Sequence, residues 1–331
     1  MNTAAIDFPH RHAAHCESGV VANLLTHQGM PLSEPMAFGL SGAMAFAYLP
    51  FIRIQEMPMI AYRLPPKAIL RGVAKALGIR FHEEKFRSPE AGEQRLNALL
   101  AQGRAVGAQA SVYWLSYCPE DMRFHFNAHN LVIFGRDGDE YLISDPVVEQ
   151  PVRCGRAELS RARFARGLLA PKGLIYYAEG TPARSIDEAM IRKAIRRTGR
   201  IMRAPLPLVG YRGINALARK IESLDATDLE AQRIVGHVVR MQEEIGTGGA
   251  GFRFLYAAFL QEAAQLTGRA HFNEFAERLL AIGDDWRMFA LRAARMVKGR
   301  DAYDMLALAT LLRGQAVQEN DFFRDLGASL S

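Results

Sequence analysis

Three side chains of this sequence have the chemistry of a nucleophile, a base and an orienting acid. Cys16 lies where apolar residues with helical spacing begin, over residues 17–27. The first turn of a helix has unpaired N–H groups and a partial positive charge, which stabilise a thiolate. His129 precedes one apolar run, and Asp145 follows the next. These residue types suit acyl transfer, with Cys16 as nucleophile, its backbone N–H as oxyanion donor, His129 as base and Asp145 as the partner that orients the imidazole.

The segment from His129 to Asp145 predicts how the histidine and the aspartate meet. It reads HNLVIFGRDGDEYLISD, two apolar runs separated by polar turn residues. If Arg136-Asp137-Gly138 is a three-residue loop with Gly138 in the left-handed conformation, Gly135 faces Asp139 and the ladder ends with His129 directly opposite Asp145. A two-residue loop at Asp137-Gly138 would place the two side chains on opposite faces. The prediction that they meet therefore depends on the loop.

The same residues also have a purely structural interpretation. A buried cysteine, a histidine at a strand end and an Asp-Pro turn can all serve packing alone, and spacing does not decide between the two interpretations. The other cysteines, Cys118 and Cys154, form no CxxC pair, which argues against a zinc ribbon and favours a reducing, cytoplasmic setting. The histidines near Cys16 are irregularly spaced, so we expect no metal site.

The composition predicts a folded chain of two domains. The sequence has 331 residues, of which 49% are hydrophobic and 23% charged, with a formal net charge of +6. Mixed helical and strand patterns run to about residue 180, and helical spacing follows almost throughout. We expect an α+β domain over residues 1–180 and an all-α domain over residues 181–331.

The least polar stretch of the sequence is Met36–Ile52, which carries no charge. It contains glycines and a proline and is shorter than the roughly 20 residues of a spanning helix. We interpret it as buried core or as the wall of an apolar pocket, and expect no membrane span. The first thirty residues show no secretory signal.

Three ordered motifs resemble the family of butirosin biosynthesis protein H. They are HCESGVVANLLTHQGMPLSEPMAFGLSG, HNLVIFGRDGDEYLISDP and GTGGAGFRFLYAAFLQEAAQLTG. The resemblance implies an N-terminal domain similar to papain-like, bacteriocin-processing cysteine peptidases, followed by a separate helical domain. It also implies an acyltransferase that takes an aminoacyl group from the phosphopantetheine thioester of an acyl carrier protein and forms an amide on an aminoglycoside amine.

The resemblance assigns the nucleophile to Cys16, the histidine to His129 and the acid to Asp145. The peptidase relatives usually have a glutamine six residues before the cysteine as an oxyanion donor, and this sequence has His10 there, so His10 becomes the oxyanion candidate. Ser116 stands where a strand of the family, here VYWLSYC, usually has a proline, which puts the acceptor contacts in doubt.

Two further patterns offer binding surfaces. A basic helix is a candidate docking face for an acidic carrier protein, through Arg192, Arg196, Arg197 and Arg200, and it lacks the aromatic platforms of nucleic-acid binders. The run GTGGAG matches GxGxxG but follows a helix instead of a strand, so it is a helix stop or an anion-binding helix start. Candidate pocket residues near the nucleophile are Glu17, Phe38, Trp114 and Tyr117.

The sequence therefore predicts a cytoplasmic, cysteine-dependent acyltransferase of secondary metabolite biosynthesis. Its partners would be an acyl carrier protein and a small-molecule amine, with the phosphopantetheine arm as part of the substrate and no bound cofactor. An amidase or peptidase, in which water takes the acyl group, and a catalytically silent acyl-binding or carrier-binding module are the alternatives. Homo-oligomerisation is left open.

Overall fold

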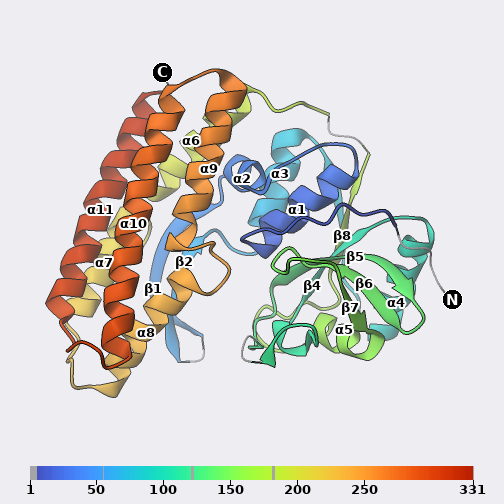
Figure 1. Cartoon of the computed structure of the whole chain (residues 1–331), viewed down its shortest axis with the longest axis horizontal. Coiled ribbons are helices and arrows are strands. Elements are labelled where there is room, and N and C mark those ends of the chain that lie inside the picture. Colours follow the sequence, from blue (N-terminus) through green and yellow to red (C-terminus); the bar gives the residue numbers. More distant parts are fainter. Residues whose placement is uncertain (1–5, 55, 121–122, 181–182, 331) are drawn as a thin grey trace. The chain divides into compact units, whose positions relative to one another are not determined.

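The chain folds into two compact units. The computed structural model describes residues 6–54, 56–120, 123–180 and 183–330. The first unit contains residues 1–37 and 66–185, and the second contains residues 38–65 and 186–331. The first mixes helices with a sheet and the second is mainly helical, which confirms the α+β class expected from the sequence (Figure 1).

A six-stranded antiparallel sheet forms the centre of the first unit. Its strands are short, and those at its centre are buried along most of their length, as expected for a sheet that is covered on both faces. Their spatial order is β3 (Arg80–Glu84), β8 (Ile175–Glu179), β4 (Val106–Ala110), β5 (His129–Asp137), β6 (Glu140–Ser144) and β7 (Val152–Gly155).

Helices pack on both faces of the sheet and bury its apolar side chains. Alternate residues of β4 and β5 join Leu96 and Leu100 of α4 (Pro89–Ala101) and Leu159 of α5 (Arg156–Arg163) in one core. The next residue along β5 points to the other face, where α1 (Cys16–His27) packs against β5, β4 and β8. The first residue of α1 is thereby held at the end of the sheet where β5 begins.

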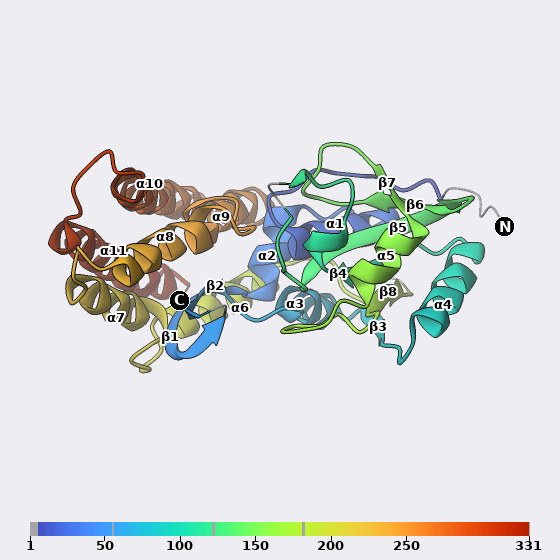
Figure 2. The same cartoon turned by 90° about the horizontal axis from the view of Figure 1, so that it is seen from below.

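The second unit joins a β-hairpin to six helices. Phe46 of β1 (Met44–Ile54) and Tyr62 of β2 (Met57–Arg63) pack against Trp286, with ring centroids 6.1 and 5.8 Å from the indole. The domain division expected at residue 180 assigned residues 38–65 to the first domain. In the structure these residues belong to the unit with the helical core. The helices are α6 (Glu188–Met202), α7 (Gly210–Glu222), α8 (Leu229–Glu243), α9 (Arg253–Thr267), α10 (His271–Val297) and α11 (Met305–Ala328) (Figure 2).

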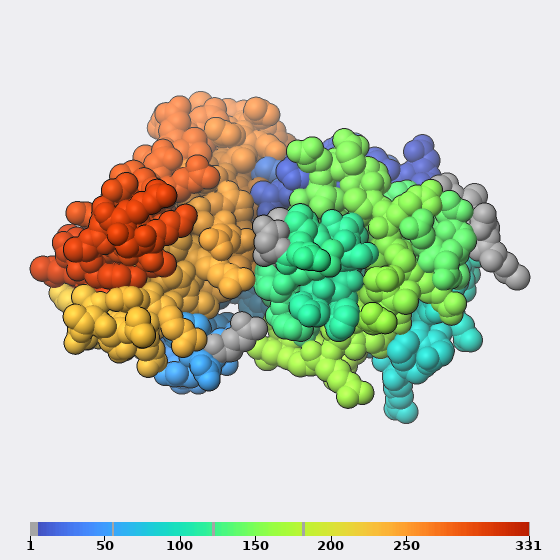
Figure 3. All heavy atoms as spheres, turned by 60° about the horizontal axis from the view of Figure 1, so that its bottom comes forward, coloured from blue at the N-terminus to red at the C-terminus, as the bar shows by residue number. Residues whose placement is uncertain are grey.

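Several elements differ from the sequence-based expectation. The charge-free run Met36–Ile52 divides between α2 (Glu34–Ser41) and β1, and Phe51 near the end of this run is 73% exposed. Light-blue spheres of the β1–β2 hairpin lie on the surface drawn in Figure 3. The run VYWLSYC is not a strand, because β4 ends at Ala110 and a 3₁₀ helix, η1 (Val112–Trp114), follows. Within the described residues, no helix is both long and apolar enough to span a bilayer.

A buried ion pair lies inside the helical unit. Arg253 donates from Nε and Nη2 to the two carboxylate oxygens of Glu319 at 2.8 and 2.9 Å, and both side chains are fully buried. The Trp286 indole also donates to Glu319 at 2.7 Å, while the guanidinium lies over the rings of Tyr62 and Trp286. The pair therefore connects α9, α10, α11 and the hairpin through a single pair of charges.

We predict that Glu319→Gln destabilises the protein by about 3–5 kcal/mol, because it leaves the Arg253 charge buried without a counter-charge. Urea unfolding of the full chain measures the effect. The matched control is Glu222→Gln, which removes the carboxylate of the half-exposed Arg313–Glu222 pair and should cost less than about 1 kcal/mol. Equal losses in the two variants would contradict this account of the helical core.

Candidate active site

The nucleophile candidate begins α1, and a carboxylate fixes the turn that precedes it. Glu34 accepts hydrogen bonds from the backbone N–H groups of Ala14 and His15, both at 2.8 Å, and from Ser18 Oγ at 2.9 Å. Burial raises the pKa of Glu34, although these hydrogen bonds lower it in part. The His15 imidazole caps the helix by accepting from the Ser18 N–H. The backbone on both sides of Cys16 is thus held by side chains.

Glu17, the residue after the nucleophile candidate, has a structural partner. Its buried carboxylate accepts from the backbone N–H groups of Lys67, Ile69 and Leu70, at 2.9–3.2 Å. These groups form the first turn of α3 (Ala68–Leu77), whose own N-cap residue makes no side-chain capping bond. Glu17 was expected to line a pocket. In the structure it caps α3, the helix against which α1 packs.

His129 and Asp145 form a buried pair beside the nucleophile candidate. His129 Nε2 lies 2.7 Å from Asp145 Oδ2, and the aspartate is fully buried. Tyr117 donates its hydroxyl to the same Oδ2 at 2.7 Å, and the Val147 N–H donates to Oδ1 at 3.2 Å. Tyr117 is therefore a partner of the acid, although its residue type suggested a pocket wall.

The electrostatics of the pair favour its charged form. Burial alone would lower the pKa of His129, but the charge and hydrogen bond of Asp145, with a hydrogen bond to Cys16, raise that pKa well above its usual range. Burial opposes the charge of Asp145 too, yet the His129 charge and the three hydrogen bonds lower its pKa. Because Nε2 faces Asp145, Nδ1 is the ring nitrogen that remains for the thiol. The structure thus brings Cys16, His129 and Asp145 together in series.

The pair forms in a different register from the one expected. Asp137 pairs with Glu140 across a two-residue turn, so Arg136-Asp137-Gly138 is not a three-residue loop. That turn alone would place His129 and Asp145 on opposite faces. A β-bulge at Phe134 shifts the register by one residue, so that Ile133 pairs with Ile143 and the two functional side chains return to one face. His129 and Asp145 are in contact as predicted, but the prediction that they lie directly opposite each other is wrong.

Asn130 is a residue of the site that the sequence reasoning missed. Its amide Nδ2 lies 3.8 Å from Cys16 Sγ and donates to the Ala128 carbonyl at 3.0 Å. Tyr176 donates its hydroxyl to Asn130 Oδ1 at 2.9 Å, which directs the NH₂ end of the amide toward the sulfur. The only sequence signal was an amide next to His129, and strand alternation assigned it to the other face.

His10 occupies a structural position next to the acid. Its Nε2 lies 3.1 Å from the Val148 carbonyl, which can only accept, so Nε2 carries the proton. Its Nδ1 then accepts from the Ser144 hydroxyl at 2.8 Å. No ring N–H is left to stabilise an oxyanion, and the structure gives the expected oxyanion role of His10 no support. Instead, His10 fixes the segment on both sides of Asp145.

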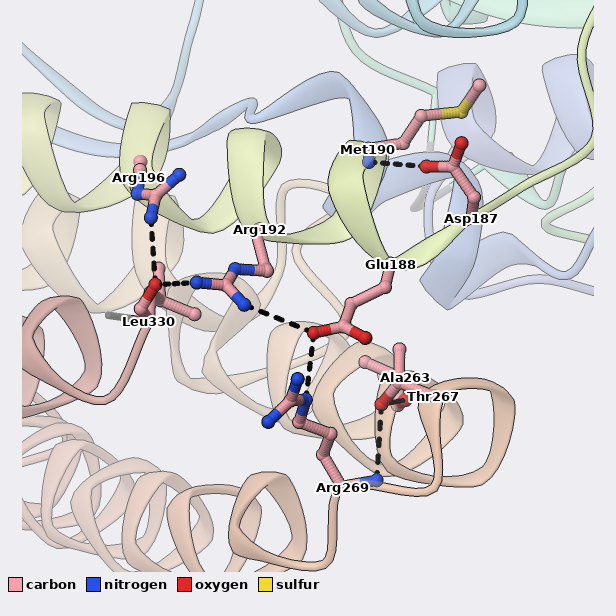
Figure 4. Close-up of polar contacts among 9 residues, drawn as sticks. All are labelled: Asp187, Glu188, Met190, Arg192, Arg196, Ala263, Thr267, Arg269 and Leu330. Carbon is pink, nitrogen blue, oxygen red and sulfur yellow. Dashed lines mark hydrogen bonds and ion pairs between the residues drawn. The ribbon is translucent and has the colours of Figure 1, made fainter.

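Three of the four arginines expected to dock a carrier protein have internal partners. Arg192 and Arg196 both donate to the Leu330 carbonyl at the end of α11, and Arg192 also pairs with Glu188 at 3.2 Å (Figure 4). Arg197 donates to the Ser41 carbonyl at 3.0 Å. These three side chains hold the helical unit together. Arg200 is exposed and remains a docking candidate.

The remaining pocket candidates, Phe38 and Trp114, have ring partners of their own. Phe38 is fully buried in the second unit, where its ring stacks on Phe252 with a centroid distance of 4.9 Å. Trp114 is 37% exposed on η1, and the Arg161 guanidinium lies over its ring.

The glycine-rich run GTGGAG is not open to an anion at its centre. The carboxylate of Glu243 accepts from the Ala250 N–H at 3.1 and 3.3 Å, and Thr247 Oγ1 accepts from the Gly249 N–H. Gly246, Gly248 and Gly249 all have positive φ, as a tight turn between helices requires. The run is therefore the connection from α8 to α9, closed by an internal carboxylate.

The other two cysteines differ from Cys16 in their surroundings. Burial and the charge of Glu158 raise the pKa of Cys154 to about 12, and burial also raises the pKa of Cys118. Both belong to the hydrophobic core of the first unit. Across the described residues, no group of three or more His, Cys, Asp or Glu side chains has the placement of a metal site.

Comparisons with known proteins found family matches for both parts of the chain. The family described as "Butirosin biosynthesis protein H, N-terminal" matches residues 15–146, which span all three residues of the series. The family described as "Domain of unknown function (DUF4872)" matches residues 157–326. No curated protein matches the chain. A crystal structure described as that of a C39-like peptidase from Bacillus anthracis is 13% identical, with a TM-score of 0.39, and the match covers 55% of this chain and 99% of that one.

The family matches and the site geometry lead to one assignment. The first unit has a cysteine at the start of a helix beside a sheet that carries the histidine, and the match to the butirosin family covers both residues. The DUF4872 match begins within α5 of the first unit and continues through the helices of the second unit, without the β1–β2 hairpin. The chain belongs to the family described as "Domain of unknown function (DUF4872)", whose match spans residues 157–326, and its residues 15–146 are similar to the N-terminal part of butirosin biosynthesis protein H.

Proposed function

We propose that this enzyme is an acyltransferase that moves an acyl group from the thioester of an acyl carrier protein, through Cys16, to the amine of a small molecule. The observation that carries the proposal is the buried imidazole of His129, which contacts Asp145 on one side and Cys16 on the other. That arrangement favours a thiolate beside an imidazolium. The family resemblance supports the carrier protein and the amine, and we place the reaction in a cytoplasmic biosynthetic pathway.

The first half-reaction acylates the enzyme. The Cys16 thiolate attacks the thioester carbonyl carbon, a tetrahedral intermediate forms, and the bond from carbon to the pantetheine sulfur breaks. The imidazolium of His129 gives its proton to the departing thiolate. The products are a Cys16 thioester and the free carrier thiol. No ATP or metal is needed, because one thioester replaces another.

The second half-reaction forms the amide. The acceptor amine attacks the Cys16 thioester, and neutral His129 takes the amine proton. Collapse of the intermediate releases the amide and restores the thiolate–imidazolium pair. Asp145 stays ionised throughout and stabilises the imidazolium. Cys16 and His129 are each only 6% exposed, which limits the access of water to the acyl-enzyme.

Asn130 is the side chain best placed to stabilise the oxyanion of both intermediates. Its amide NH₂ already lies beside the sulfur, and Tyr176 fixes its orientation before substrate arrives. The backbone N–H of Cys16, in the first turn of α1, is the second donor that we propose. Asn130 thereby takes the role that the sequence had suggested for His10.

The first prediction of this proposed function concerns the covalent intermediate. Acetyl, hexanoyl and glycyl thioesters of N-acetylcysteamine, which imitate the end of a pantetheine arm, should acylate the wild-type protein at residue 16. Intact mass should show the adduct in wild type and none in Cys16→Ala, with Cys118→Ala as the control that keeps it. An adduct on another cysteine would overturn the proposal. An adduct that decays to free acid equally fast with and without added amines would assign the enzyme to the hydrolases, and binding without any adduct would make the chain a binding module.

The second prediction concerns pH. Asp145 raises the pKa of His129 and keeps the imidazolium to higher pH, so Asp145→Asn should let burial lower that pKa. The thiolate then loses its counter-charge, and the rate of Cys16 alkylation by iodoacetamide at about pH 6 should fall on the order of tenfold. Tyr117→Phe keeps the carboxylate charge and should change the rate less. An unchanged pH profile in Asp145→Asn would refute the coupling of these groups.

The third prediction separates oxyanion stabilisation from thiol reactivity. Asn130→Ala should slow acylation by the same thioesters on the order of 10²-fold, the cost of losing one oxyanion donor. Alkylation by iodoacetamide has no tetrahedral oxyanion, so its rate should stay within a few fold of wild type. His10→Ala is the matched comparison and should spare acylation relative to Asn130→Ala. The opposite ranking would return the oxyanion role to His10.

A further inference from the structure

The helical unit has a groove of about 540 Å³ between α6 and α11. Its apolar lining includes Ile195 of α6 and Phe323 and Leu326 of α11. Arg196, Arg200 and Arg203 line the same groove. The three arginines are four and three residues apart, so they follow one face of the helix. The groove therefore combines an apolar surface with a row of guanidinium groups.

The groove arginines are not neutralised by carboxylates within the described residues. Arg196 donates to the Leu330 carbonyl at 2.8 Å, and Arg203 donates to the Asn320 amide oxygen at 3.4 Å, both neutral acceptors. Neither they nor Arg200 forms an ion pair in that part of the chain. By contrast, Arg278 on α10 pairs with Asp325 of α11 at 2.8 Å. Among the described residues the row therefore has no carboxylate partner, and an external anion would supply one.

Two glycines leave room for a ligand against the helix backbones. A Cβ atom at Gly327 would have no heavy atom within 4 Å, and one at Gly199 would meet only the Phe323 carbonyl oxygen at 3.8 Å. Glycine costs about 1 kcal/mol relative to alanine within a helix. At both positions space for a side chain exists, so packing does not explain the glycines.

We propose that this groove binds a small amphiphilic phosphate monoester, with its phosphate on Arg200 and Arg203 and its apolar part on Phe323 and Leu326. Guanidinium groups bind phosphate through paired, charge-assisted hydrogen bonds. A volume of about 540 Å³ lies within the range of small-molecule sites, and the apolar lining stabilises a ligand that buries hydrocarbon there. The proposal does not depend on acyl transfer, because none of these residues belongs to the active site.

Isothermal titration calorimetry of the full chain with hexyl phosphate tests the site. Two control ligands are inorganic phosphate, which lacks the apolar part, and hexyl glucoside, which lacks the phosphate. Hexyl phosphate should bind at least tenfold more tightly than either. Arg200→Ala/Arg203→Ala should weaken binding at least tenfold, whereas Arg233→Ala, which removes an exposed arginine of α8 outside the groove, should not. Thermal unfolding verifies that the variants are folded.

A second variant fills the groove without changing its charge. Gly327→Leu places a side chain in the open space of α11 and should abolish hexyl phosphate binding while keeping or raising the melting temperature. Cys16→Ala should bind like wild type, so failure of the acyl-transfer proposal would leave this result untouched. Equal affinity for hexyl phosphate and inorganic phosphate, or unchanged affinity in Arg200→Ala/Arg203→Ala or Gly327→Leu, would overturn the proposal.

Discussion

The contact between a fully buried carboxylate and a buried imidazole is the interaction on which the active site depends. Removing either charge from water is costly, and the cost is offset only when partners satisfy both groups. Asp145 has three such partners in His129, Tyr117 and Val147. The contact also fixes which imidazole nitrogen faces the thiol. The contacts that satisfy Asp145 therefore also determine which side of the imidazole faces the Cys16 sulfur.

The N-terminal segment brings the nucleophile to this pair. The Ile6 N–H donates to the carbonyl of Phe134 at the bulge, His10 contacts both sides of Asp145, and the Ala13 N–H donates to the Pro146 carbonyl at 2.7 Å. The segment thus runs along the β5–β6 hairpin before α1 begins. Glu34 then fixes the turn that leads into Cys16. These hydrogen bonds hold Cys16 close to Asp145, although the two residues are far apart in sequence.

Local sequence patterns predicted α1, the strands of the β5–β6 hairpin and the three residues of the series. Helical spacing located α1, and apolar runs located the two strands. The register was mispredicted because a one-residue bulge leaves no signal in apolar alternation. Asn130 was missed because alternation assigns it to the other face of β5, while α1 brings the thiol to that edge. The spacing of the basic residues on α6 identified a shared face, but not the Leu330 carbonyl that occupies Arg192 and Arg196.

The membership of the β1–β2 hairpin could not be predicted, since hydrophobicity shows that a segment is buried but not in which core. In the structure the chain passes from one unit to the other after residues 37, 65 and 185. Each unit is therefore discontinuous in the gene. A recombination event with one crossover near residue 185 would give the recipient helices without their hairpin, and Trp286 would lose its contacts with Phe46 and Tyr62. Exchange of whole units between relatives requires two coordinated replacements, so the two halves are expected to be inherited together.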